Sequence, residues 1–318
     1  MKKIFLLIAS SVLLLAGCTK ESKLSDTVAE GETVTVKVMA QLENAVPATR
    51  ASWDNDGQAD SLDHWVIEVR DTLQRNVVYY WTEKAGEKGV RTQTFELTLV
   101  KGHTYEIAFW ADKSGCYNAG NLEQVSFKDI SKVGNSDSYD AFFACEQFKA
   151  DGKMSMSAKL YRPLAQVNII TTDLPKLKAS STKEAYLSYK PKSFSFKTTL
   201  PTVFDVYSGK TSGEKEVTIT PAAAVDTCYA DYAAAAAKTT IFMVYALTTL
   251  DTKTDGKSDV RNIDFSLKSG NVDIPCQFNS IPLKRNWRTN IVGELLTNTT
   301  SWTVEVVPNW IGEKNVTK

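Results

Sequence analysis

The sequence is poor in histidine, balanced in charge and without the residue spacings of common catalytic and metal sites. It has only two histidines, so a histidine-based triad or zinc site would have to use His64 or His103. Lysine plus arginine equals aspartate plus glutamate at 37 each, and zero net charge offers no general attraction for nucleic acid. No G-x-S-x-G motif and no C-x-x-C pair is present. We therefore expect neither an enzyme nor a cofactor.

Two stretches match part of a binding motif, and in each the rest of the motif is missing. Gly209-Lys210-Thr211 matches the end of a phosphate-binding loop, but Phe204 stands where the leading glycine is required and no helical pattern follows. The acidic run at residues 54–60 matches the start of an EF-hand loop, but Gln58 takes the third ligand position and the closing glutamate is missing. Both are interpreted as polar turns, and no metal site is expected.

Long hydrophobic runs are also missing. The apolar run Ile4–Leu15 is shorter than the roughly 20 residues of a membrane-spanning helix, and it follows two lysines, which is typical of a secretory signal. It leads into Leu15-Ala16-Gly17-Cys18, which resembles the bacterial lipobox, whose cysteine is lipidated and becomes the new N-terminus. We expect residues 1–17 to be removed and lipid on Cys18 to hold the protein to a membrane outside the cytoplasm. The alternative is a plain secretory signal in which Cys18 is incidental.

Four of the five cysteines lie beyond Cys18, namely Cys116, Cys145, Cys228 and Cys276. An oxidising compartment allows them three disulfide pairings, among which the sequence does not choose. Free buried thiols are the alternative, and both readings stay open.

From Ser61 onward, apolar residues alternate with polar ones in short runs that turn-forming residues separate. Almost no 3.6-residue periodicity is present, so the pattern is typical of an all-β sandwich. The candidate strands of the first half, after an opening strand described below, are His64–Arg70, Val77–Thr82, Thr92–Val100, Thr104–Ala111, Ala141–Phe148 and Met154–Tyr161. Lys101-Gly102 is expected to form a tight hairpin joint, because glycine accepts a positive φ.

The pattern is interrupted at Arg162-Pro163, where proline cannot donate to a sheet ladder, so we expect a domain boundary there. A second set of candidate strands follows: Ala165–Thr172, Ser193–Tyr207 broken at Pro201, Glu216–Thr220, Thr240–Leu247, Asn262–Lys268, Arg288–Leu296 and Trp302–Val307. Two seven-stranded sandwiches in tandem fit the length better than one large sheet. Helix is expected only as one turn near Leu122–Ile130 and a short surface turn in the alanine run Tyr232–Lys238.

The opening strand is Thr33–Leu42, within the stretch Gly31–Ala51. Its alternate positions are apolar, with polar residues between them, which predicts a strand with one buried face. These apolar residues are Val34, Val36, Val38, Ala40 and Leu42. A short tether with Pro47 and a lone arginine, Arg50, follows the strand.

Two segments far apart in the chain resemble the fimbrillins, the type V pilins of Bacteroidetes. They are Tyr161–Ile169 (YRPLAQVNI) and Ile281–Thr297 (IPLKRNWRTNIVGELLT). With the lipobox and Arg50, the resemblance covers nearly the whole chain. It implies an all-β protein with two tandem transthyretin-like seven-stranded β-sandwich domains after a lipoprotein signal peptide.

The resemblance also implies maturation by an arginine-specific protease and assembly by strand exchange. The cut would fall between Arg50 and Ala51 and release a lipidated propeptide with its strand, in which Val34, Val36, Val38 and Leu42 face the core. A neighbouring subunit would then supply a replacement strand. The last strand, with Trp302, Val304 and Val306 on one face, is a candidate donor; the alternative is that it only completes its own domain. Likewise, Arg50 on its own would be a solvated linker charge.

The resulting hypothesis is a structural subunit of a surface fimbria that supports adhesion. Its expected parts are residues 1–17 (signal peptide), 18–50 (lipidated propeptide), 51–162 (N-terminal sandwich) and 163–318 (C-terminal sandwich). Its expected partners are other pilin subunits, the protease and, before cleavage, the outer membrane through Cys18. The alternative is an uncleaved surface-anchored lipoprotein, either a pilus anchor or tip or a glycan-binding module. The sequence does not choose among stalk, tip and anchor.

Overall fold

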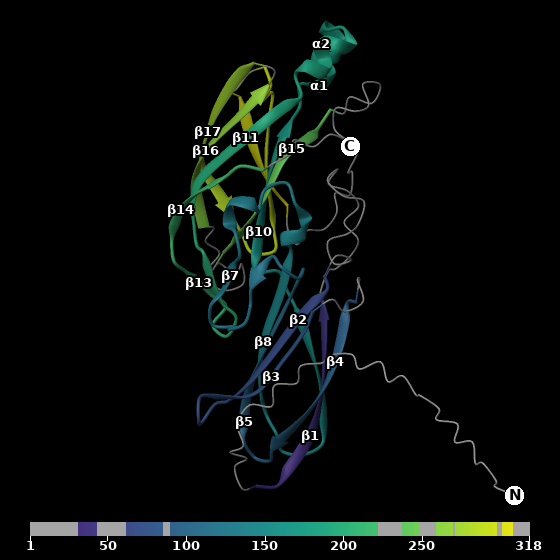
Figure 1. Ribbon diagram of the computed structural model, residues 1–318, viewed down its shortest axis with the longest axis vertical. Helices are drawn as coiled ribbons and strands as arrows, with labels where there is room; N and C mark the ends of the chain where they lie inside the picture. The colour runs from purple at the N-terminus through teal and green to yellow at the C-terminus, as the bar shows by residue number, and fades with distance from the viewer. Residues whose placement is uncertain are drawn as a thin grey trace, which may run out of the picture.

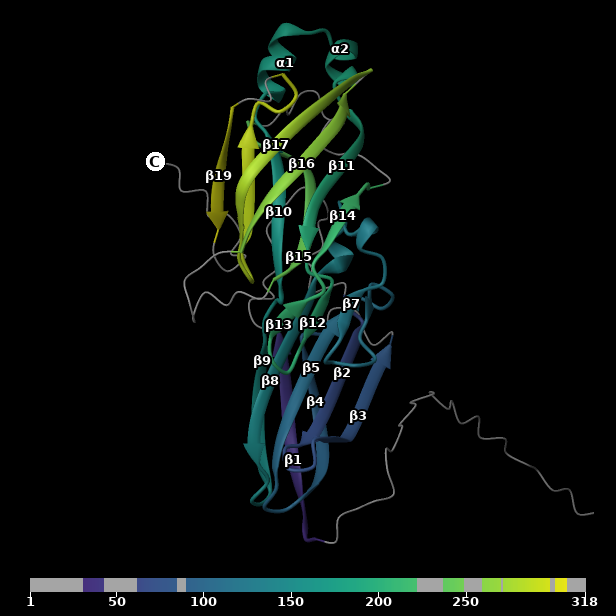
Figure 2. The same ribbon diagram turned by 90° about the vertical axis from the view of Figure 1, so that its left-hand side faces the viewer.

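The computed structural model describes residues 31–42, 62–84, 90–221, 237–248, 259–269, 271–297 and 301–307. The molecule is elongated, with one β-sandwich stacked on another along its long axis (Figures 1 and 2). The expected all-β fold is confirmed. Among the described residues, no helix has the length and hydrophobicity needed to cross a bilayer.

The first sandwich is built from one mixed sheet and one antiparallel sheet, with a core between them. One sheet has the order β4-β1-β9, formed by Thr92–Val100, Thr33–Leu42 and Met154–Leu160. The other has the order β3-β2-β5-β8, formed by Asn76–Lys84, His64–Asp71, Thr104–Asp112 and Ala141–Lys149. Residues with alternate spacing on both sheets share this core, as the period-2 pattern predicts.

The second sandwich has two four-stranded sheets. Their orders are β15-β10-β18-β19, formed by Thr239–Leu247, Leu164–Thr171, Arg288–Gly293 and Trp302–Val307, and β14-β11-β16-β17, formed by Lys215–Ile219, Pro191–Leu200, Asp259–Ser269 and Val272–Leu283. A cluster of phenylalanines fills its centre; the ring centroid of Phe242, for example, lies 5.3 Å from that of Phe196, on which it stacks, and 5.4 Å from that of Phe265, to which it is tilted.

A small sheet at the junction joins the two sandwiches. Its order is β13-β12-β7-β6, formed by Lys210–Ser212, Val203–Asp205, Val125–Phe127 and Tyr117–Asn118. Its side chains cover the outer face of the first sandwich: Trp110 of β5 lies 5.2 Å from Tyr117 and 6.2 Å from Phe204, between ring centroids. A segment of the second half therefore packs on the first, and the division of the chain at residue 162 stays a prediction.

Several predicted elements differ from the structure. The helical turn expected near Leu122–Ile130 is wrong, because Val125–Phe127 forms β7, which pairs with β12 from far along the chain; a 3₁₀ helix, η2, covers Ile130–Lys132, and another, η3, covers Asp137–Tyr139. β17 was not predicted, because it contains Pro275 and Pro282, and proline is unusual within a strand. It is an edge strand of its sheet, where proline is tolerated.

Two short helices were also not predicted, α1 at Leu174–Ser180 and α2 at Lys183–Ser188, which cap the far end of the second sandwich (Figure 1). The last predicted strand before β19 ends at Gly293 rather than Leu296, because a turn follows. The turns predicted at Gly102 and Gly209 are confirmed, and both glycines have a positive φ, of 83° and 63° respectively. The acidic run 54–60 and most of the alanine run, 232–236, lie outside the described residues.

Candidate functional site

The first strand of the chain, β1, occupies the centre of its sheet. It runs antiparallel to β4, from Thr33 opposite Val100 to Gln41 opposite Thr92. On its other side it runs parallel to β9, from Val36 opposite Met154 to Leu42 opposite Leu160. Figure 2 shows β1 along the length of the first sandwich. Both of its hydrogen-bonding edges are therefore used within the single chain.

The inward face of β1 is a large part of the first core. Val36, Val38 and Ala40 are completely buried, Leu42 is 5% exposed, and Val34 packs half-buried at the end of the row. The outward residues between them are exposed; Lys37, for instance, makes a solvent-accessible ion pair of 3.8 Å with Glu96 on β4. Removing β1 would therefore open an apolar groove along the sandwich.

The size of this groove can be expressed as free energy. Burying a valine or leucine side chain contributes about 1.5–3 kcal/mol, so Val36, Val38 and Leu42 together contribute about 5–9 kcal/mol. The net stability of a domain is about 5–15 kcal/mol. The groove would also expose unpaired N–H and C=O groups of β4 and β9, which form a template for another strand.

The ends of β1 are tied to the strands beside it. The amide of Leu42 donates to the carbonyl of Arg91 at 3.0 Å, and the amide of Lys101 donates to the carbonyl of Glu32 at 2.7 Å. The Lys101 Nζ also pairs with the Glu32 carboxylate at 2.8 Å. The predicted lipidation site Cys18 and the predicted cleavage site Arg50–Ala51 lie outside the described residues.

The candidate donor strand, β19, is an edge strand. It pairs antiparallel with β18 along its whole length, from Trp302 opposite Gly293 to Val307 opposite Arg288. Trp302 meets Phe278 edge-on, with ring centroids 5.3 Å apart, and Val304 packs against the same core. Val306 is half-buried. In the single chain, β19 thus completes its own sheet, and its other edge is unpaired among the described strands.

The two segments that carry the fimbrillin resemblance meet in space. β10 and β18 run side by side and parallel, and the Asn168 amide donates to Asn290 Oδ1 at 2.9 Å. Just before β10, buried Arg162 forms an ion pair with buried Asp140 at 2.9 Å and lies 4.5 Å from the centre of the Phe142 ring. These motifs therefore build the junction where the chain leaves β9 and enters the second sandwich.

The three cysteines that the structure describes, Cys116, Cys145 and Cys276, are free thiols. Burial raises the pKa of Cys116 and Cys276 to about 11 and that of Cys145 to about 12. They are unreactive at neutral pH because little thiolate is present. Cys228 lies outside the described residues.

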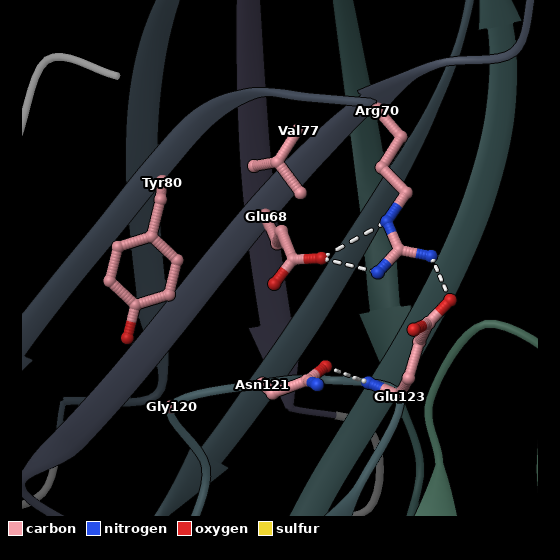
Figure 3. A pocket seen from close by; sticks show the side chains of 7 residues that line it. All are labelled: Glu68, Arg70, Val77, Tyr80, Gly120, Asn121 and Glu123. Carbon is pink, nitrogen blue, oxygen red and sulfur yellow. Dashed lines mark hydrogen bonds and ion pairs between the residues drawn. The ribbon is translucent and has the colours of Figure 1, made fainter. Parts of the chain in front are cut away.

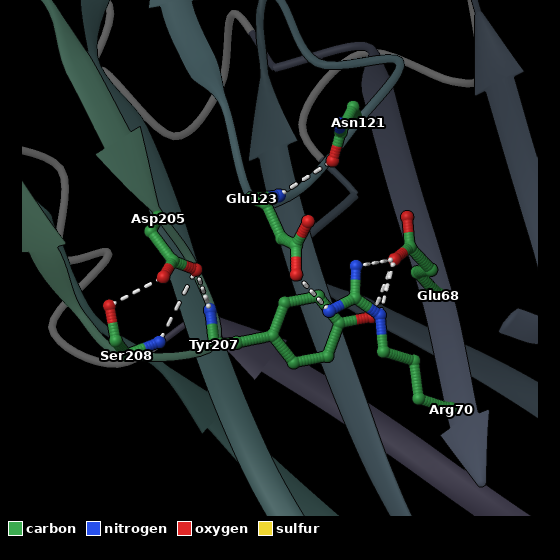
Figure 4. A network of polar contacts seen from close by, with 7 residues as sticks. All are labelled: Glu68, Arg70, Asn121, Glu123, Asp205, Tyr207 and Ser208. Carbon is green, nitrogen blue, oxygen red and sulfur yellow. Dashed lines mark hydrogen bonds and ion pairs between the residues drawn. The ribbon is translucent and has the colours of Figure 1, made fainter. Parts of the chain in front are cut away.

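A second polar site, unnoticed in the sequence, lies on the outer face of the four-stranded sheet. Arg70 of β2 is held between two carboxylates: its Nε and Nη2 donate to Glu68 Oε1 at 3.1 and 2.8 Å, and its Nη1 donates to Glu123 at 2.5 Å (Figure 4). The ring of Tyr207 covers the guanidinium at 3.7 Å, and the Tyr207 hydroxyl donates to Glu68 Oε1 at 2.6 Å. The turn that carries Tyr207 is fixed by Asp205, which accepts from the Tyr207 amide at 2.9 Å.

The surroundings of Arg70 and Tyr207 keep the first charged and the second protonated. Burial alone would lower the pKa of Arg70, but the interactions with Glu123, Tyr207 and Glu68 outweigh it and raise that pKa. Burial, together with the hydrogen bond to Glu68, raises the pKa of Tyr207. The only hint in the sequence is a Glu-x-Arg pair directly after the apolar run Trp65–Ile67; Tyr207 is too far along the chain to be linked to it.

The fold defines a class of protein with two stacked β-sandwiches in which the first strand is central and the last lies at an edge. The chain belongs to a family of unknown function, DUF6562, whose sequence model matches residues 26–318. No curated protein matches it.

Solved structures share the fold at low identity. A provisionally assigned polysaccharide-binding protein (DUF1812) of Bacteroides thetaiotaomicron has a TM-score of 0.50 at 10% identity, over 87% of this chain and 96% of that one. A provisionally assigned cell adhesion protein of Bacteroides eggerthii gives the same TM-score, identity and coverage. The tip fimbrial protein Mfa3 of Porphyromonas gingivalis has a TM-score of 0.47 at 10% identity, over 87% and 100% of the two chains. At these identities the similarity concerns the fold alone.

Proposed function

We propose that this protein is a structural subunit of a surface fimbria, exported as a lipoprotein on Cys18 and activated by cleavage between Arg50 and Ala51. The observation that carries the proposal is the position of β1. It ends at Leu42, and β2 begins at His64, so a cut at Arg50 severs the stretch of polypeptide that joins β1 to β2. After that cut, the contacts of β1 with β4, β9 and the core hold it in place.

Cleavage converts a stable monomer into one that can exchange a strand. The groove left by β1 can be filled by a strand that has apolar residues at alternate positions and pairs with both β4 and β9. β19 has this alternation in Trp302, Val304 and Val306. As an edge strand it has one sheet partner to give up, whereas β1 has two. The segment 308–318 that follows it is the other candidate to extend or supply the donor.

A surface role in adhesion agrees with the names of the structural neighbours at TM-score 0.50, one a polysaccharide-binding and one a cell adhesion protein. The proposal gives the chain no catalytic role. Its partners are other fimbrial subunits, an arginine-specific protease and, before cleavage, the outer membrane.

The test is N-terminal sequencing of protein taken from the cell surface, compared with Arg50→Ala and Arg50→Lys variants. The parent is expected to begin at Ala51 and to form polymers that resist detergent. Both variants are expected to stay lipidated at Cys18 and monomeric, since lysine keeps the charge but not the arginine that the protease requires.

The matched control is Arg75→Lys, which changes an exposed arginine in the β2–β3 turn and is expected to leave processing unchanged. Polymers of the Arg50→Ala protein in normal amount would show that cleavage is not the trigger. A parent protein that begins at lipidated Cys18 would instead indicate an anchored lipoprotein, the alternative expected from the sequence.

A further inference from the structure

We propose that the pocket beside Arg70 binds an uncharged saccharide. The pocket lies between strands β2 and β3 and the turn before β7, with a volume of about 490 Å³ (Figure 3). It is lined by Glu68, Arg70, Val77, Tyr80, Gly120, Asn121 and Glu123. This volume is within the range of small-molecule sites, about 300–1,000 Å³.

The floor of the pocket holds a carboxylate that uses only one of its two oxygens in hydrogen bonds to the described protein groups. Glu68 is 4% exposed, and its Oε1 accepts from Arg70 twice and from the Tyr207 hydroxyl. Among the described residues, none donates to its Oε2, which points away from Arg70 toward the side of Gly120 and Asn121 in Figure 3. This oxygen is open on the pocket side, and a ligand hydroxyl could donate a hydrogen bond to it.

Arg70 is not free to bind an anion. Its guanidinium already donates to both Glu68 and Glu123, and the face of Tyr207 covers it. Two carboxylates and one cation leave the lining with a net negative charge. Sulfated or uronic sugars are therefore repelled, and neutral hydroxyl groups are favoured.

The remaining wall and rim match the two kinds of surface on a sugar ring. Tyr80 lies half-buried at one side of the pocket, where its ring offers an apolar face for the C–H side of a pyranose. Burial and the negative charge of Glu68 raise the pKa of Tyr80, so its hydroxyl stays protonated. At the rim, Asn121 Oδ1 accepts from the Glu123 amide at 2.9 Å, which fixes the side chain; none of the described residues accepts from its Nδ2.

Other occupants fit less well. Within the described ranges, no group of three or more histidine, cysteine or acidic side chains is placed to hold a metal ion. The pocket is also in the sheet opposite β1, so it is present whether or not the chain is cleaved or polymerised. The inference therefore does not rest on the proposed strand exchange.

The test uses the full-length chain on an array of neutral, uronic and sulfated saccharides, followed by titration calorimetry with the strongest neutral binder. Binding to a neutral saccharide is expected. Gly120→Leu should weaken it at least tenfold, because a side chain at this position enters open space at the pocket, where a Cβ meets no atom within 4 Å. Tyr80→Ala should weaken saccharide binding by a similar factor, and Asn121→Ala should weaken it by a smaller one.

The matched control is Gly152→Leu, since a Cβ on Gly152 also meets no atom within 4 Å and this glycine lies in the β8–β9 turn, away from the pocket. It should bind as the parent does, and the thermal midpoints of both glycine variants should match that of the parent. The inference is overturned if no neutral saccharide binds, if only anionic ones bind, or if folded Gly120→Leu protein binds as tightly as the parent.

Discussion

The two sandwiches hold the ends of the chain in different ways. In the first, the opening strand β1 is central and pairs on both sides. In the second, the closing strand β19 is at an edge and pairs on one side, with half-buried side chains. Loss of β1 would divide a sheet and uncover a core, whereas loss of β19 would only narrow a sheet. The sandwich that would lose more of its core is therefore the one whose end strand is followed by the predicted cleavage site.

The largest effect on stability is expected when β1 and β19 are removed in turn. A chain that lacks residues 1–50 should lose about 5–9 kcal/mol of stability in the first sandwich from side-chain burial alone and should aggregate or polymerise. A chain that lacks residues 301–318 should stay folded and monomeric. Urea unfolding and light scattering measure both. Equal loss in the two deletions would contradict the comparison.

A single charge placed in each strand is a sharper form of the same experiment. Val38→Asp puts a carboxylate at a completely buried position and should cost about 4 kcal/mol or more. Val304→Asp, at a half-buried edge position, should cost about 1 kcal/mol. Chemical denaturation of the two full-length variants gives the difference, and a larger cost for Val304→Asp would reverse the assignment of the central strand.

The ion pair at the junction can be compared with a surface pair of the second sandwich. Asp140→Asn removes the carboxylate charge that pairs with buried Arg162 and should cost about 3–5 kcal/mol. Glu214→Gln removes a 2.8 Å pair with Arg261 in which the carboxylate is half exposed, and should cost about 0–1 kcal/mol. Thermal unfolding in low and high salt distinguishes the two ion pairs, since only the surface pair should weaken with salt.

The smallest signal is expected from the reactivity of two thiols, half-buried Cys145 and buried Cys276. At pH 8, alkylation of Cys145 in the first sandwich and Cys276 in the second should be slow, because burial holds their pKa values near 12 and 11. In the chain that lacks residues 1–50, Cys145 should react quickly and Cys276 should stay protected. Peptide mass spectrometry after timed alkylation distinguishes the two sites. Rapid reaction of both would mean that the sandwiches unfold together.

Local alternation was enough to predict most of the fold. β1 and β4 have the bounds expected from their period-2 pattern, because one face of each is buried and the other is in solvent. The alternating pattern does not predict a strand whose sequence departs from it. β17 contains Pro275 and Pro282, and β7 is only three residues long and exists because β12 pairs with it.

The polar pocket could not be predicted for a related reason. Two of its lining residues, Glu68 and Arg70 of one strand, are held by Tyr207, which is separated from Glu68 by 139 positions and is brought there by the junction sheet. Such a contact depends on the packing of the two halves and not on any local pattern. The predicted cleavage site is the reverse case, since Arg50 is evident in the sequence and lies outside the described residues.

The direction in which β1 runs has a consequence for any assembly. An incoming strand that repeats the pairing of β1 would run parallel to β9 and antiparallel to β4, in one defined orientation. Every subunit joined in this way would face the same way as the one before it. The resulting fibre would have polarity, with an open groove at one end and an unused donor at the other, and it would grow by a different reaction at each end.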